Sequence, residues 1–247
     1  MAEFVYPPVI RFALGVFKLL GLELDVQGSE NIPDEGGAVL ASTHVSYIDF
    51  IFVGLGAHPK RRLVRFMAKK QVFDHPLGGP LMRGMHHIPV DRKAGAAAYD
   101  DALRALKEGE LIGVFPEATI NRAFDVKELK TGAARMAIET GTPLIPVAIW
   151  GTQRIWTKGR PRNLRRRGIP VTIVVGEPIP VAPGDELPLV TQRLHDRLRE
   201  MLTHAQDEYP DRPESESDNW WQPHRLGGGA PTVEESRRMD AEDYGKR

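Results

Sequence analysis

The chain has 247 residues, of which 41% are hydrophobic and 27% are charged, a composition typical of one large globular domain with a full core. It contains no cysteine, which excludes disulfides, thiol catalysis and cysteine-ligated metals. The formal net charge is zero, but from Asp207 onward 11 acidic residues stand against 6 basic ones, which leaves 22 acidic and 27 basic residues in the body. A basic body with an acidic tail suits an anionic partner such as a lipid headgroup, a phosphate ester or nucleic acid.

The N-terminal segment is apolar, but Arg11 and Lys18 interrupt it. They lie too close together for a membrane-spanning helix, which needs roughly 20 apolar residues, and no secretory signal is evident. A helix beginning at Pro8 would carry both charges on one side and an apolar stripe on the other, made of Val9, Phe12, Val16, Leu19 and Leu20. This pattern is typical of a helix lying in a membrane surface and also of one packed on its own domain.

Hydrophobic periodicity predicts strands and helices that alternate along the chain. The predicted strands span residues 37–43, 63–68, 87–90, 111–115, 143–150 and 170–175, and the predicted helices span 48–55, 94–106, 128–140 and 188–205. Such alternation predicts a single α/β domain with a mostly parallel central sheet flanked by helices. We expect the N-terminal amphipathic helix and lead-in to occupy 1–35, the main domain 36–206 and a polar acidic tail 207–247.

The tail is rich in Pro, Ser, Glu and Asp and then reads G-G-G, which is typical of a disordered or loosely docked segment. Trp220 and Trp221 are the exception. Adjacent tryptophans either dock on the domain or lie at a membrane interface, and we expect docking.

Two stretches place an aspartate five residues after a histidine. His44 follows a predicted strand at its carboxyl end, where open α/β sheets bind ligands, and Ser46 is a candidate cap for the next helix. A turn there can fold Asp49 back onto the imidazole, which leaves the second ring nitrogen ready to accept a substrate proton. His86 and Asp91 enclose an extended segment of roughly 16 Å and point to opposite faces. Their spacing is therefore interpreted as a coincidence.

Further polar residues follow other predicted strands at their carboxyl ends. Arg92 is suited to bidentate anion binding, and Glu117 and Thr119 belong to the stretch F-P-E-A-T at 115–119. Because the carboxyl ends of parallel strands meet at one edge, convergence of these residues with His44 predicts a single active site.

Four blocks in this order resemble the PlsC-type glycerolipid acyltransferases, the 1-acyl-sn-glycerol-3-phosphate acyltransferase family. The blocks are T-H-V-S-Y-I-D at 43–49, H-I-P-V-D-R at 87–92, F-P-E-A-T at 115–119 and P-L-I-P-V at 143–147. The chain departs from the family in the third block, where Ala118 replaces a glycine and Ile120 replaces an arginine. Candidates to supply the missing phosphate contact are Arg122, Lys69, Lys127 and Lys130.

The resemblance implies a glycerol-3-phosphate acyltransferase-like fold and transfer of a fatty acyl group from acyl-CoA or acyl carrier protein to the free hydroxyl of 1-acyl-sn-glycerol 3-phosphate, giving phosphatidate. His44 would be the general base, oriented by Asp49, with no covalent acyl-enzyme, no cofactor and no metal. Arg92 and Glu117 would hold the glycerol phosphate, and Thr119, Lys69 and Arg122 would complete the substrate-binding set. The alternatives are another lysolipid or glycolipid acceptor, or a non-catalytic membrane-binding protein of the same fold.

The segment 154–167 holds seven Lys/Arg and no acidic residue. We expect it to contact an anionic membrane, with coenzyme A phosphates as the alternative target, and we expect the protein at the cytoplasmic face of the cell membrane as a peripheral or monotopic protein. A metallohydrolase cluster of His44, Asp49, His86 and His87 lacks the usual ligand spacing. Nucleic-acid binding is not expected, because no recognisable nucleic-acid module accompanies the arginines.

Overall fold

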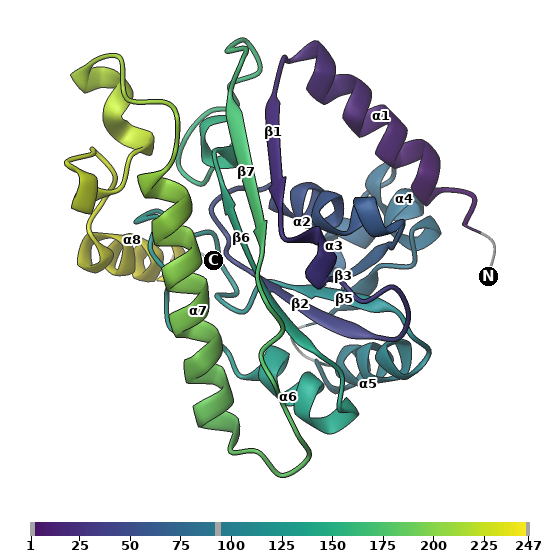
Figure 1. The fold of residues 1–247 in the computed structure, drawn as a ribbon. Coiled ribbons are helices and arrows are strands. Elements are labelled where there is room, and N and C mark those ends of the chain that lie inside the picture. The colour runs from purple at the N-terminus through teal and green to yellow at the C-terminus, as the bar shows by residue number, and fades with distance from the viewer. Residues whose placement is uncertain (1–2, 92–94, 246–247) are drawn as a thin grey trace.

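The computed structural model describes residues 3–91 and 95–245 as a seven-stranded sheet with helices on both faces (Figure 1). The strands are β1 (Glu23–Gln27), β2 (Ala38–Ser42), β3 (Val64–Lys69), β4 (Ile88–Val90), β5 (Leu111–Val114), β6 (Leu144–Trp150) and β7 (Pro170–Val175). The α-helices are α1 (Tyr6–Leu19), α2 (Asp49–Ala57), α3 (Lys70–Phe73), α4 (Gly78–Gly84), α5 (Gly95–Lys107), α6 (Gly132–Thr140), α7 (Leu187–Asp207) and α8 (Val233–Gly245). The predicted α/β class is confirmed.

The strand order is β1-β7-β6-β2-β5-β3-β4. The five strands from β6 to β4 are parallel to their neighbours, whereas β7 runs antiparallel to β6 and β1 is parallel to β7. The carboxyl ends of β2, β3, β4 and β5 therefore share one edge of the sheet. Strand β1 is absent from the prediction, because all five of its residues are exposed and it lacks the buried apolar run of the other strands.

The core lies on both faces of the sheet because successive strand residues point in opposite directions. Val39 and Ala41 of β2 pack with residues of α5, α6 and α7, whereas Ala38 and Leu40 pack on the other side with residues of α1 and α2. Burial of both faces explains why this strand is a continuous apolar run rather than an alternating one.

The N-terminal helix α1 lies against the domain and also carries an exposed apolar face. Phe17 stacks on Phe52 of α2 with ring centroids 4.8 Å apart, and the Tyr6 hydroxyl donates to the Val64 carbonyl at 2.8 Å. Phe12 and Leu19 nevertheless remain 75% and 67% exposed. Among the described residues, no helix combines the length and apolar character needed to cross a membrane.

The C-terminal segment is folded, so the expectation of a disordered or loosely docked tail is wrong for residues 207–245. It forms short 3-10 turns at Glu216–Trp221 and His224–Leu226 and then α8 (Figure 1), whose Asp240 pairs with Arg122 of the loop after β5. The predicted docking of the tryptophans is confirmed for Trp221, which is 2% exposed and lies under the Arg154 guanidinium at 4.3 Å. The division into 1–35, 36–206 and 207–247 stays a prediction.

Candidate active site

The turn after β2 brings His44 and Asp49 together. Asp49 is the first residue of α2, and its Oδ2 lies 3.0 Å from Nδ1 of His44. Residue Ile48 occupies the N-cap of α2 and makes no side-chain cap, so the predicted cap by Ser46 is wrong. The Ser46 hydroxyl instead donates to the Trp156 carbonyl at 2.5 Å, which ties the turn to the loop after β6.

The Asp49 carboxylate is fully buried and accepts hydrogen bonds from several groups besides the imidazole. Oδ2 accepts the backbone N–H groups of Val45 and Ser46 at 2.7 Å each, and Oδ1 accepts the Thr152 hydroxyl at 2.6 Å. An ionised carboxylate only accepts hydrogen bonds, and this set of donors suits it. His44 then donates from Nδ1, which leaves Nε2 as a proton acceptor.

The backbone of His44 is held on both sides by the segment that follows β5. Its N–H donates to Oε1 of Glu117 at 3.0 Å, and its carbonyl accepts the Asn121 N–H at 2.8 Å. The imidazole stacks on Phe115 with ring centroids 4.1 Å apart, while 18% of the side chain stays exposed. The ring is therefore fixed in orientation and still accessible from one side.

Glu117 lies beside His44, but its carboxylate is engaged with the protein. Oε2 accepts the Lys127 N–H and the Asn121 side-chain amide at 3.1 Å each, and the residue is 6% exposed. Burial raises the pKa of Glu117 to about 7, against the opposing effect of these hydrogen bonds. These contacts hold the His44 backbone in place, and the role of Glu117 in holding the glycerol phosphate stays a prediction.

The other expected substrate contacts are differently situated. Lys69 is the last residue of β3, and Thr119 lies half-buried in the loop after β5. Arg122 makes ion pairs with Asp240 at 3.0 Å and with Asp243 at 2.7 Å, both on α8. Arg92 lies outside the described residues.

The alanine that replaces the family's glycine has a left-handed backbone. Ala118 has a φ of +58°, a conformation that glycine adopts freely and that strains a residue with a Cβ. Ile120, at the position of the family's arginine, is 5% exposed. Both departures therefore change the loop that holds His44, one through backbone strain and the other through a buried apolar side chain.

The second His-Asp stretch has the extended shape that its sequence predicts, with β4 between its ends. His87 points into the domain, where Nδ1 accepts the Phe66 N–H at 3.1 Å. Burial, followed by the Arg65 charge, lowers the pKa of His87 to about 4, so the imidazole is neutral. No group of metal-ligating side chains occurs within residues 3–91 and 95–245, and the cluster of four residues that a metallohydrolase would need does not form there.

The basic segment 154–167 is partly covered by the C-terminal segment. Arg154 is 2% exposed and pairs with Asp211, while Arg166 pairs with Glu214 and Asp218 at 2.9 and 3.0 Å. The cations of this segment that remain exposed are Arg160, Arg162, Arg165 and Arg167. Only these are available for the expected contact with an anionic surface.

Thr152 and Asn121 contribute to the site and are absent from the sequence prediction. Thr152 is 103 residues from Asp49 in the chain, and no local spacing marks such a contact. Asn121 lies two residues after the F-P-E-A-T block, and this proximity is the one sequence feature that could have marked it as a site residue.

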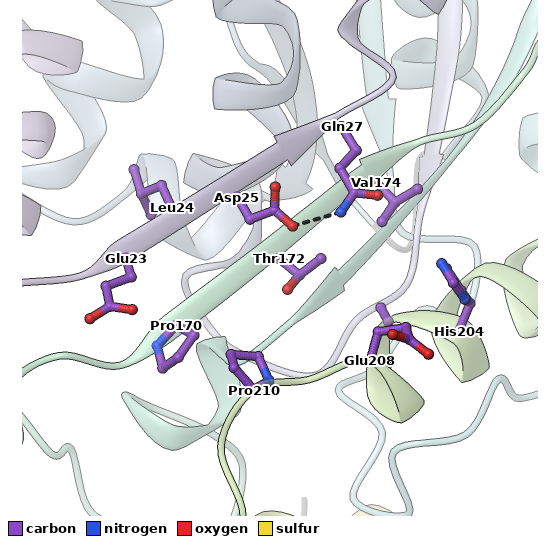
Figure 2. A pocket seen from close by; sticks show the side chains of 11 residues that line it. Glu23, Leu24, Asp25, Gln27, Pro170, Thr172, Val174, His204, Glu208 and Pro210 are labelled. Atoms are coloured by element: carbon purple, nitrogen blue, oxygen red, sulfur yellow. Dashed lines mark hydrogen bonds between the residues drawn. The ribbon is translucent and has the colours of Figure 1, made fainter.

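A groove on the opposite part of the sheet contains no residue of this site. It has a volume of about 260 Å³ and lies between β1, β7 and the end of α7 (Figure 2). Asp25 in this groove accepts the Gln27 side-chain amide at 2.6 Å. Its lining mixes acidic, amide, hydroxyl and apolar side chains with one histidine, His204 (Figure 2), which pairs with no carboxylate among the described residues, unlike His44.

The fold and the site define an α/β protein with a hydrogen-bonded His–Asp pair at the carboxyl edge of a mostly parallel sheet. The family model Acyltransferase matches residues 23–150. The 1-acyl-sn-glycerol-3-phosphate acyltransferase of Bacillus subtilis (strain 168) is 31% identical over 199 residues, which cover 76% of this chain and 93% of that protein. The enzyme of the same name from Limnanthes douglasii is 33% identical over 186 residues, covering 70% and 63% of the two chains.

A solved structure supports the same family assignment. The crystal structure of the 1-acyl-sn-glycerophosphate acyltransferase PlsC from Thermotoga maritima matches with a TM-score of 0.68 and 25% identity, covering 83% of this chain and 81% of that chain. The chain belongs to the acyltransferase family.

Proposed function

We propose that the protein transfers a fatty acyl group from a thioester to the free hydroxyl of 1-acyl-sn-glycerol 3-phosphate, giving phosphatidate. The observation that carries the proposal is the His44–Asp49 pair, with Nδ1 3.0 Å from a fully buried carboxylate. The names of the relatives from Bacillus subtilis and Thermotoga maritima support this choice of acceptor.

In the proposed reaction, Nε2 of His44 takes the proton of the glycerol hydroxyl as the oxygen attacks the thioester carbonyl. The tetrahedral intermediate then collapses, the C–S bond breaks, and the imidazolium returns the proton to the leaving thiolate. Asp49 stabilises the imidazolium between these steps. No covalent acyl-enzyme is needed, and general-base assistance of this kind contributes roughly 10²–10⁴ in rate.

An apolar cavity of about 320 Å³ is proposed to house an acyl chain. It lies between α1, α2 and α4, and its lining is almost entirely apolar. Phe50, which lines it, directly follows Asp49 in the chain. Phe50 contacts Phe66, Phe66 stacks on Phe115, and Phe115 stacks on the His44 ring, so this row of rings connects the proposed acyl-chain cavity with the His44–Asp49 pair.

Arg92, Lys69 and Thr119 remain proposed contacts of the polar part of the substrate, Arg92 on the sequence alone. Lys69 ends β3 and Thr119 follows β5, and the carboxyl ends of both strands lie at the same edge of the sheet as His44. The donor is proposed to be acyl-CoA or acyl carrier protein. No cofactor is proposed, since both steps need only proton transfer and positioning.

We further propose that the protein works at the cytoplasmic face of the membrane as a peripheral or monotopic protein. Phe4, Phe12 and Leu19 of the N-terminal segment are 82%, 75% and 67% exposed. Phe12→Asp should reduce flotation with anionic vesicles, because it places a charge where an apolar face would be buried. Leu189→Asp on α7 is the matched control, since Leu189 is 58% exposed on a different element. Equal flotation of Phe12→Asp and the wild type would contradict the membrane role of α1.

The catalytic test uses His44→Ala with acyl-CoA, acyl carrier protein thioesters and a panel of lysolipid acceptors, with products identified by mass. We expect transfer to fall by roughly 10²–10⁴. His195→Ala is the matched control, since His195 also pairs with a carboxylate, Asp196 at 3.1 Å, but on the surface of α7. Retained transfer by a folded His44→Ala protein would refute the base assignment, and preference for another acceptor would refute the choice of lysophosphatidate.

A further inference from the structure

Helix α8 is held on the domain by charged groups rather than by an apolar face. None of its described residues belongs to the apolar core clusters, and Val233 and Met239 are each 39% exposed. Within residues 233–243 the one buried side chain is Ser236, whose hydroxyl lacks a hydrogen-bond partner among the described residues. A helix of 13 residues without an apolar face is marginally stable by itself. Its docking therefore depends on ion pairs.

Two carboxylates of α8 fill a cluster of three cations. Asp240 lies 3.0 Å from Arg122 and 2.5 Å from Lys127. Lys158 lies 2.7 Å from Asp240 and 3.0 Å from Asp243. The second terminal nitrogen of Arg122 lies 2.7 Å from Asp243. The side chains of the three cations are 11%, 15% and 13% exposed, so the helix covers a site of concentrated positive charge.

This cation cluster borders the catalytic dyad. Arg122 directly follows Asn121, whose N–H donates to the His44 carbonyl at 2.8 Å. Lys158 directly follows Thr157, whose hydroxyl donates at 2.6 Å to the carbonyl of the residue after His44. Two independent segments therefore fix these cations beside the backbone of the proposed base.

The charge and the donors of the cluster match a phosphate monoester. The two carboxylates of α8 bring two negative charges, and a phosphate monoester carries about −1.5 to −2 at pH 7 with three strong acceptor oxygens. A guanidinium binds such oxygens in pairs. Nε of Arg122 is buried without a hydrogen-bond partner within the described part of the chain. The α8 carboxylates thus leave unused a donor that a third oxygen can engage.

We propose that Arg122, Lys127 and Lys158 form a binding site for a phosphate monoester, and that Asp240 and Asp243 occupy it until a phosphate-bearing substrate displaces α8. The inference rests on the proposed function, which supplies two such groups: the headgroup of the acceptor and the 3′-phosphate of coenzyme A. Helix α8 then covers the phosphate site in the absence of substrate and is displaced when the substrate binds.

The first test is hydrogen exchange of the full-length protein, followed over residues 233–245 at constant ionic strength. Glycerol 3-phosphate should accelerate exchange in α8, whereas glycerol should not. If coenzyme A accelerates exchange and dephospho-coenzyme A does not, the donor's 3′-phosphate is the ligand. Unchanged exchange with both glycerol 3-phosphate and coenzyme A would overturn the proposal.

The second test removes the internal competitor. The double variant Asp240→Asn/Asp243→Asn should bind glycerol 3-phosphate about tenfold more tightly, equivalent to roughly 1.4 kcal/mol of lost competition, and should exchange faster in α8 without ligand. Glu234→Gln/Glu242→Gln is the matched control, because it makes the same charge change on the same helix at residues that form no ion pair with any described residue. Asp243→Asn alone serves if the double variant does not fold. Unchanged affinity in a folded variant would refute the competition.

These readouts are independent of acyl transfer. If glycerol 3-phosphate releases α8 but the protein transfers no acyl group to lysophosphatidate, the proposed function fails and the site stands. If transfer proceeds while α8 responds neither to glycerol 3-phosphate nor to coenzyme A, the further inference fails and the proposed function stands.

Discussion

Thr152→Val tests whether the buried partner of Asp49 contributes to transfer. The Thr152 hydroxyl donates to Oδ1 of Asp49 at 2.6 Å, and both residues are fully buried. Valine has a similar shape, so the change chiefly removes the hydroxyl and leaves Oδ1 without its donor. A hydrogen bond to a charged group is worth about 1.5–3 kcal/mol. We expect unfolding free energy to fall by about that amount.

The same bond should matter more when His44 becomes an imidazolium, because Asp49 must then hold its charge in a fixed position. If about half of this hydrogen-bond energy is lost only in the transition state, kcat falls roughly 4- to 12-fold. If all of it is lost there, kcat falls about 10- to 150-fold. The KM values should stay near those of the wild type, since Thr152 supports Asp49 rather than a substrate.

The assay follows thiol release against substrate concentration, with thermal unfolding measured on the same samples. Thr152→Ser keeps the hydroxyl and should restore most of kcat. Thr191→Val on α7 is the remote control, because its hydroxyl donates to the Leu187 carbonyl of its own helix at 2.8 Å. A folded Thr152→Val protein with wild-type kcat, or a serine variant as slow as the valine variant, would refute the reasoning.

Two stability predictions concern the loop after β5. Ala118→Gly should raise the free energy of unfolding by ~0.5–1 kcal/mol, because glycine accepts the φ of +58° without a Cβ clash. The control Ala97→Gly, on the exposed side of α5, should lower it by about 1 kcal/mol. Thermal melts in which these two changes have the opposite signs would contradict backbone strain at Ala118. For Glu117, burial raises the pKa of the folded state to about 7, above the ordinary value of 4.5, so the native state holds this proton more tightly than the unfolded state does. Its stability contribution therefore declines as pH rises from about 4.5 to 7 and stays low above that. Urea unfolding should show the wild type losing ~3 kcal/mol relative to Glu117→Gln across this window, and a pH-independent difference would disprove the shift.

Local sequence was sufficient for the elements whose information lies within a few residues. The apolar run at 37–43 and the turn T-H-V-S-Y-I-D predict a buried strand followed by a returning carboxylate, and the structure has both. Local geometry decides whether a histidine and an aspartate five residues apart can interact, because a turn brings the two side chains together and an extended strand keeps them apart. The left-handed Ala118 was likewise marked as a departure, although only the backbone angle revealed its strain.

Contacts between distant segments were decided by the tertiary structure. Thr152 reaches Asp49 across 103 residues, and Arg122 meets Asp240 across 118. Composition made the C-terminal segment look disordered, since it offers few apolar residues to bury. It folds because its carboxylates form ion pairs with cations of the main domain and because Trp221 is buried. By itself the sequence determined the strands from β2 to β7, the fold class and the His44–Asp49 pair, since each follows from periodicity or short spacing. Which charges pair across the molecule depends on how the segments pack in space, and only the folded chain sets that.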